Sequence, residues 1–362
     1  MSPRAHLKVQ GTGPWQRGYD RGRQIGPEIT WAWRTYAELF ETAARGVTLD
    51  VPTLALGTVT ATRAWAPELV EEMEGVAEGA GVPLWTVAAL NARTEILAAS
   101  GTARANECST VVHTGARTMG GQSWDWHEEL AGAWHVQSVR GSAGDGTLGF
   151  TGITEYGILA KIGINEAGVA VLFNILGHVD DGVGGVPVHL VARRVLGSAT
   201  SFADAVAILT DAPVSASTVM TVVTAERAAS VEVSPAGAAV VTPDERGWLV
   251  RANHFLDPAL AAGELRGRLE PETYDRLRVL RARVEGRPGL DGADDLASLL
   301  TVHPDGGAEV CCHAPVGGAL GTRWATLATV VAEPAAGRLM VHDGGPCTAR
   351  PSTWTTLTAP SR

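Results

Sequence analysis

Cysteine is scarce in this sequence: four occur among 362 residues, at positions 108, 311, 312 and 347. Four are too few for the disulfide framework of a secreted chain of this length, and adjacent Cys311 and Cys312 are poorly placed to pair with each other. No uninterrupted apolar stretch reaches about 18 residues, and the first residues lack the apolar segment of a signal peptide. We therefore expect a soluble, cytoplasmic protein with reduced thiols and no membrane association.

Basic residues are also few, with 29 lysines and arginines against 39 aspartates and glutamates, and they form no block along the chain. A net charge of −10 without a basic patch argues against nucleic acid or an anionic membrane as the main partner. The length is sufficient for a large hydrophobic core in one or two domains.

The first hundred residues carry apolar positions at helical spacing. Three segments are predicted to be helical: 17–45 with a break near Pro27, 67–80, and 83–99. Residues 100–107 are polar and glycine-containing, which is typical of an exposed segment that cleavage requires.

From residue 108 the pattern changes to period two and short apolar runs, which predicts strands. Helices are expected at 189–196, 201–209 and 274–284. Strands in antiparallel runs with helices clustered between them predict an α+β fold. The predicted strands are 108–113, 120–126, 133–139, 147–153, 157–164, 168–175, 217–223, 229–233, 238–241, 325–332 and 339–342.

Cys108 opens the first of these strands and Asp125 lies in the second. If the intervening turn centres on residues 115–118, Asp125 lies directly opposite Cys108. A thiol facing a carboxylate at the start of a strand suggests a nucleophile exposed by internal cleavage. Cleavage before Cys108 would free an α-amine with a pKa near 8, which can serve as the base for its own thiol. The alternative is a buried core cysteine.

Several motifs follow one another along most of the chain in one order. Residues 108–110 followed by 121–125 resemble the catalytic hairpin of the N-terminal-nucleophile hydrolases. More narrowly, the sequence resembles the acyl-coenzyme A:6-aminopenicillanic acid acyltransferase family, peptidase family C45. Further similar segments are 91–95, 161–169, 185–189, 251–255 and 326–330.

The resemblance implies a four-layer αββα sandwich with a helical N-terminal segment. Residues 1–107 would form the small chain after self-cleavage between Glu107 and Cys108, and residues 108–362 the catalytic domain. The small chain would remain bound as a partner of the large one. Glu107 stands where glycine is common in the family.

The resemblance also implies roles for individual residues. Cys108 would be the nucleophile, and Asp125 would orient its α-amine. Asn253 would donate its amide to the oxyanion, with Asn174 as a second donor. Substrate-binding positions are expected beside them at Ser123, Trp124 and Trp126. Ser123 replaces a usual asparagine of the family, and Cys312 stands where relatives often carry arginine.

The expected activity is transfer of an acyl group from a thioester or amide, through a Cys108 acyl-enzyme, to an amine or to water. The sequence leaves acyltransferase and amidohydrolase open, since one covalent intermediate serves both. The partners are a small-molecule acyl donor and an amine acceptor. No cofactor is expected, with acyl-coenzyme A as a candidate substrate. A rival interpretation is an uncleaved, non-catalytic scaffold or binding protein of the same fold.

A third hypothesis is a metal-dependent hydrolase built on Cys311, Cys312 and His313. Adjacent cysteines do not easily face one ion, and the usual Cys-x2–4-Cys spacing is missing, so no metal is expected. His303, His313 and His342 are expected to be polar core or surface residues. Arg93 and Glu95 are predicted either to form an ion pair or to lie on a solvated helix face.

Overall fold

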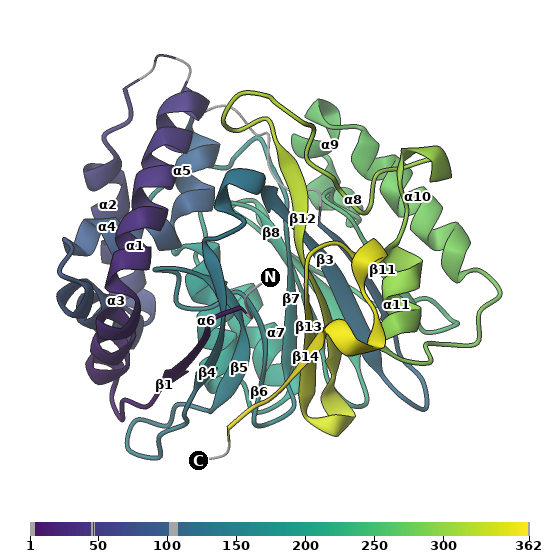
Figure 1. The fold of residues 1–362 in the computed structure, drawn as a ribbon, viewed down its shortest axis with the longest axis horizontal. Helices are drawn as coiled ribbons and strands as arrows, with labels where there is room; N and C mark the ends of the chain where they lie inside the picture. The colour runs from purple at the N-terminus through teal and green to yellow at the C-terminus, as the bar shows by residue number, and fades with distance from the viewer. Residues whose placement is uncertain (1–3, 45, 47, 101–107, 361–362) are drawn as a thin grey trace.

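Two β-sheets lie face to face between layers of helices in the computed structural model (Figure 1), which describes residues 4–44, 46, 48–100 and 108–360. Sheet A has eight strands in the order β1-β4-β5-β6-β7-β8-β9-β10, and sheet B has six in the order β11-β2-β3-β12-β13-β14. Sheet A contains β1 (His6–Val9), β4 (Trp134–Val139), β5 (Phe150–Glu155), β6 (Ile162–Asn165), β7 (Ala170–Ile175), β8 (Thr218–Val223), β9 (Ala228–Ser234) and β10 (Gly237–Val241). Sheet B contains β2 (Ser109–His113), β3 (Met119–His127), β11 (Trp248–Arg251), β12 (Trp324–Glu333), β13 (Arg338–Asp343) and β14 (Trp354–Thr358).

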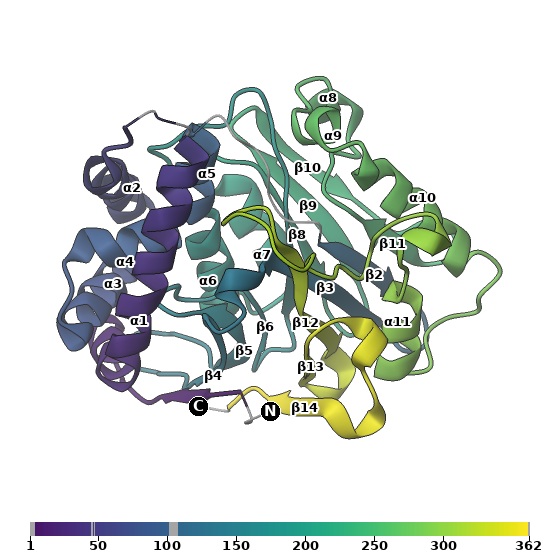
Figure 2. The same ribbon diagram turned by 45° about the horizontal axis from the view of Figure 1, so that its top comes forward.

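Helices cover the outer face of each sheet, as Figure 2 shows from a second direction. Sheet A is covered by α6 (Val188–Ser198) and α7 (Phe202–Asp211), and sheet B by α10 (Glu272–Val284) and α11 (Ala293–Leu300). Short helices α8 (Pro258–Ala261) and α9 (Arg266–Leu269) precede α10. The predicted α+β fold with αββα layers is confirmed.

The N-terminal segment forms α1 (Pro14–Ala44), α2 (Val51–Trp65), α3 (Pro67–Ala80), α4 (Leu84–Asn91) and α5 (Arg93–Ala99). The predicted break in the first helix is confirmed at Ile25, whose φ of −134° is not helical. Glycines let α1 and α3 pack closely, since a Cβ at Gly18 would lie 1.9 Å from the Glu72 carbonyl oxygen. The segment is not wholly helical, because β1 pairs with β4 at the edge of sheet A.

The hairpin of β2 and β3 corrects the predicted register by one residue. Ser109 pairs with Ser123 and His113 with Met119, so the connecting loop spans residues 114–118. Continuing this register places Cys108 opposite Trp124, and the prediction that it faces Asp125 is wrong. A slip of one residue moves a side chain to the other face of a sheet. Asp125 therefore lies on the face covered by α10 and α11, whereas Cys108 faces sheet A.

Within the described ranges, no helix combines the length and apolar character needed to cross a membrane.

Candidate active site

Cys108 lies at the start of β2, where its side chain enters the space between the two sheets and is 1% exposed. Its Sγ is 4.0 Å from the main-chain oxygen of Asp125. Burial, and next the charge of Asp125, raise the pKa of the thiol to about 11, while Lys161 and a hydrogen bond with Gln122 act in the opposite direction. In this closed arrangement the thiol is protonated at neutral pH, so a base is needed to make it a nucleophile.

Two side chains from different layers hold the carbonyl oxygen of Cys108. Asn174 of β7 donates from Nδ2 at 2.9 Å, and Arg276 of α10 donates from Nη1 at 3.1 Å. Thr110 donates its hydroxyl to Asn174 Oδ1 at 2.8 Å and so orients the amide. These two contacts, both from buried donors, hold the main chain at the residue just before β2.

Asn253 lies just after β11 and joins the same network. Its Oδ1 accepts from both terminal nitrogens of Arg276 at 3.1 Å, and its Nδ2 donates to the Ile175 carbonyl at 2.8 Å. The structure thus brings together three predicted residues, Cys108, Asn174 and Asn253. One hydrogen of each amide nitrogen is used by a main-chain oxygen, which leaves a second hydrogen on each.

Arg276 connects these residues and was missed from the sequence. It is 1% exposed and lies on the buried face of α10 with Leu277 and Leu280. An arginine among leucines at helical spacing was the available signal, since a buried guanidinium requires acceptors.

Asp125 is buried beside Cys108, but its main chain and its carboxylate contact different residues. Its main-chain oxygen contacts the Cys108 thiol, whereas its Oδ2 accepts a hydrogen bond from Cys312 Sγ at 3.6 Å. Cys312 therefore supplies a thiol donor to this carboxylate.

The three predicted substrate-binding residues are all buried in β3. Ser123 Oγ accepts from the Ser109 amide at 3.3 Å and donates to the Val310 carbonyl at 3.4 Å. The ring of Trp124 lies under Lys161 Nζ at 3.8 Å, and Trp126 donates from Nε1 to the Tyr36 hydroxyl at 2.7 Å. Each contributes to packing in this structure, and contact with substrate stays a prediction.

Lys161 and Glu155 form a buried ionic group on the sheet A side of the thiol. Lys161 Nζ lies 3.2 Å from Glu155 Oε2, and Arg93 of α5 lies 2.8 Å from the same oxygen. Tyr36 of α1 donates its hydroxyl to Glu155 Oε1. Burial lowers the pKa of Lys161 to about 7, while Glu155 and Cys108 oppose that change. The sequence-based site lacks this group, because its members come from three separate elements and the loop before β6.

Arg93 and Glu95 are both fully buried, so of the two predicted alternatives the solvated helix face is wrong. Arg93 pairs with Glu155. Glu95 Oε1 accepts instead from the Val188 amide at 2.9 Å, at the first turn of α6.

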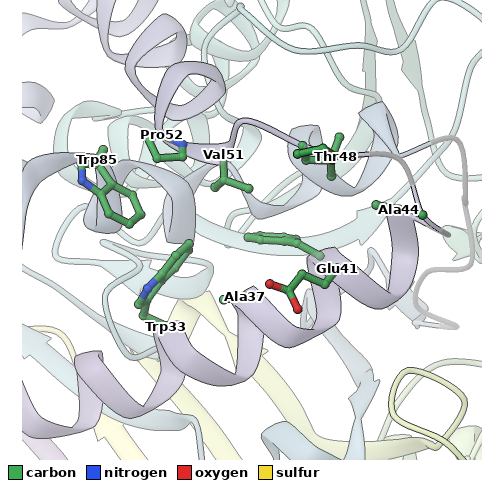
Figure 3. Close-up of a pocket in the computed structure, with 11 residues that line it drawn as sticks. Trp33, Ala37, Glu41, Ala44, Thr48, Val51, Pro52 and Trp85 are labelled. Atoms are coloured by element: carbon green, nitrogen blue, oxygen red, sulfur yellow. The ribbon is translucent and has the colours of Figure 1, made fainter.

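A cleft of about 420 Å³ lies in the N-terminal segment and is shown in Figure 3. Its lining residues include Trp33 and Glu41 of α1, Val51 at the start of α2, and Trp85 of α4. None of the residues around Cys108 lines it. We therefore do not assign it to the chemistry of the thiol.

Comparison with known proteins finds one family that matches the middle of the chain. The sequence profile of the family described as acyl-coenzyme A:6-aminopenicillanic acid acyl-transferase matches residues 112–287, which include Asp125, Asn174, Asn253 and Arg276. This match supports the resemblance drawn from the motifs and indicates an enzyme of acyl transfer or amide hydrolysis.

The acyl-coenzyme A:6-aminopenicillanic-acid-acyltransferase 40 kDa form of Emericella nidulans is 28% identical over 349 residues, covering 94% of this chain and 93% of that protein. Among solved structures, a Caenorhabditis elegans N-acylethanolamine-hydrolyzing acid amidase ortholog covers 63% of this chain and 93% of its own, with 14% identity and a TM-score of 0.45. A mutant conjugated bile acid hydrolase from Clostridium perfringens covers 70% of this chain and 92% of its own, with 10% identity and a TM-score of 0.46. Similarities this low add nothing to the fold described above.

Proposed function

We propose that this protein is a cysteine N-terminal-nucleophile acyltransferase or amidohydrolase that activates itself by cleavage between Glu107 and Cys108. The observation that carries the proposal is the position of Cys108 at the start of β2, with its carbonyl held by Asn174 and Arg276. A nucleophile needs such a fixed main chain, because small displacements of reacting atoms cost large factors in rate. Glu107 lies outside the described residues.

Self-cleavage uses the Cys108 thiol on the bond before it. The sulfur attacks the carbonyl carbon of Glu107, the C–N bond breaks, and the nitrogen takes a proton, which leaves a thioester and a free α-amine. Water then hydrolyses the thioester, giving a carboxyl group on Glu107 and a free thiol on Cys108. The α-amine thereafter supplies the base that a buried, protonated thiol lacks.

Acyl transfer repeats this chemistry on a substrate. The α-amine accepts the thiol proton, the sulfur attacks the donor carbonyl, and the leaving thiol or amine departs with that proton. An acceptor amine or water then releases the acyl group from Cys108. The second amide hydrogens of Asn253 and Asn174 stabilise the oxyanion in both steps, each contributing about 3 kcal/mol as at comparable sites. Asp125 lies within electrostatic reach of Cys108 and holds the α-amine in place.

The substrates we propose are a small thioester or amide donor and an amine acceptor or water. Acyl-coenzyme A is the first donor to test, because it appears in the names of the matching family and of the Emericella nidulans relative. We propose that Trp124 and Trp126 form the apolar wall beside the acyl group, with Ser123 behind them, and that the reaction needs no cofactor.

Intact mass spectrometry tests the proposal. The purified chain should separate under denaturing conditions into pieces of about 11 and 27 kDa, in proportion to their lengths, with the larger beginning at Cys108. Cys108→Ala should remain one chain and be inactive. Cys108→Ser keeps a hydroxyl nucleophile and should cleave slowly, which separates loss of the nucleophile from loss of the fold.

The rival scaffold interpretation predicts a different set of results. The wild-type chain would stay uncut, and Cys108 would form no covalent adduct with acyl-thioesters or thiol-directed probes in native buffer. A chain that is uncut yet turns over acyl-thioesters would instead disprove the α-amine as the base.

A further inference from the structure

Two histidines and two cysteines meet at the end of sheet B. The four are His303 and His313 in the segment between α11 and β12, Cys311 in the same segment, and Cys347 in the short 3-10 helix η4 (Pro346–Thr348). One ligand atom from each lies within 4.8 Å of every other. His303 and Cys347 are partly exposed and His313 is exposed, so solvent has access to the cluster.

Hydrogen bonds alone do not account for this arrangement. Three atoms converge on His313 Nε2: Cys347 Sγ at 3.5 Å, Cys311 Sγ at 3.7 Å and His303 Nε2 at 3.2 Å. An imidazole nitrogen either donates one hydrogen or accepts through one lone pair. It can satisfy one of these three neighbours, whereas a cation at their centre would be bound by all four groups at once.

The three separations that involve His313 match those of a tetrahedral zinc site. Bond lengths of about 2.3 Å to sulfur and 2.05 Å to nitrogen give ligand separations of roughly 3.6 Å between sulfur and nitrogen and roughly 3.3 Å between two nitrogens. The observed separations are 3.5 and 3.7 Å for sulfur to nitrogen and 3.2 Å for nitrogen to nitrogen. We propose that His303, Cys311, His313 and Cys347 bind one Zn²⁺ ion, whose binding releases the two thiol protons to solvent.

The main chain positions the ligands without the ion. The Val302 carbonyl accepts from the amides of Val310 and Cys311 at 3.0 Å, which closes the loop that carries His303. Gly344 has a φ of +119°, which turns the chain after β13 toward η4. A Cβ at Gly345 would lie 2.9 Å from Cys311 Sγ, so glycine leaves space for the sulfur.

The neighbouring cysteines have different partners. Cys311 faces the cluster and Cys312 faces Asp125, which agrees with the argument that adjacent cysteines do not share an ion. The ligand set considered from the sequence was incomplete, because it lacked His303 and Cys347. Four protein ligands leave no open position, which indicates a structural ion. Cys311 and His313 flank Cys312 in the chain, so this ion holds the loop whose Cys312 side chain contacts Asp125.

Metal content of the full chain is the first test. Protein purified without chelators from zinc-supplemented medium should contain one zinc per chain by inductively coupled plasma mass spectrometry. Cys347→Ser and Cys311→Ser should each lose at least tenfold in zinc affinity. Cys312→Ser removes the adjacent thiol outside the cluster and should retain one zinc per chain.

Cobalt provides a test that needs no variant. Co²⁺ added to metal-free, folded wild-type protein should give the intense ligand-field bands of a tetrahedral site and a thiolate charge-transfer band, and Zn²⁺ should abolish both. Three results would overturn the proposal: a folded wild-type chain that gives no such spectrum and retains no zinc, equal zinc content in Cys311→Ser and wild type, or a Cys311–Cys347 disulfide in fresh protein. None of these readouts depends on self-cleavage or acyl transfer.

Discussion

The first step of the proposed activation occurs before the α-amine exists. Cys108 then has a thiol pKa of about 11, so another group must accept its proton. Lys161 is suited to this task because burial lowers its pKa to about 7, and its charge and that of Cys108 influence each other. A lysine that is neutral above pH 7 can act as a base in a site where an ordinary lysine would be protonated.

We expect Lys161→Met to slow self-cleavage by roughly 100-fold or more at pH 8, as for the loss of a general base. Lys161→Arg should be equally slow, because a guanidinium does not deprotonate. In the wild type the cleavage rate should rise with pH through about 7, where Lys161 loses its proton. Time-resolved intact mass measurements after refolding at several pH values would give these rates.

Lys8, the only other lysine in the sequence, is the matched control. It is exposed on β1, so Lys8→Met should cleave at the wild-type rate. Wild-type cleavage rates in Lys161→Met would exclude Lys161 as the base.

At the scale of elements, α6 is joined to the N-terminal segment by a buried carboxylate. Glu95 of α5 accepts from the Val188 amide at the N-terminus of α6, where the helix dipole favours negative charge. Burial nevertheless raises the pKa of Glu95 from 4.5 to about 7. Desolvation outweighs the hydrogen bond from Val188 and the charge of Arg93, so ionisation of this carboxylate lowers the stability of the fold.

The sign of the pH dependence follows from this raised pKa. Below pH 4.5 Glu95 is protonated in both the folded and unfolded states, so it causes no difference in stability. Between pH 4.5 and 7 the unfolded state loses the proton first, and the free energy of unfolding falls as pH rises. Glu95→Gln, which keeps an acceptor for Val188, should therefore match wild type near pH 4.5 and be more stable by about 3 kcal/mol above pH 7.

Urea unfolding of both proteins at pH 5 and pH 8 would measure this difference. Exposed Glu78→Gln on α3 is the control and should show no such change. A stability difference between Glu95→Gln and wild type that is the same at both pH values would contradict the prediction.

At the scale of the whole molecule, residues before and after the proposed cleavage point share one core. β1 completes sheet A beside β4, and buried ion pairs join Glu72 to Arg193 at 2.7 Å and Arg93 to Glu155 at 2.8 Å. Buried charges are costly to expose singly, so the two pieces should not separate after cleavage.

We expect the cleaved protein to elute from size-exclusion chromatography as one species of 37.7 kDa and to give two pieces only in denaturant. Glu155→Gln leaves Arg93 and Lys161 without their shared carboxylate and should destabilise the assembly by about 3–5 kcal/mol. Exposed Glu226→Gln serves as the control and should leave the denaturation midpoint unchanged. Separation of the wild-type pieces in native buffer would contradict this prediction.

Local pattern determined much of the fold. The helix at 67–80 was predicted with the bounds of α3, and the closing strand pair within two residues of β12 and β13. Apolar period, proline at a helix start and glycine at its end are properties of neighbouring residues, so they can be read without a partner. The motifs around Cys108, Asn174 and Asn253 likewise indicated from the sequence the family to which the chain is similar.

Only the tertiary structure decided which side chains meet. A register that differs by one residue at the 114–118 loop places Asp125 on the opposite face of the sheet from the predicted one. Arg276 contacts Cys108 although the two lie 168 positions apart in the chain. The Cys2His2 cluster joins Cys347 to His313 across 34 positions. Such contacts depend on register and on the packing of layers, which no local pattern fixes. The sequence by itself therefore determined the elements and the candidate nucleophile, whereas packing determined its partners.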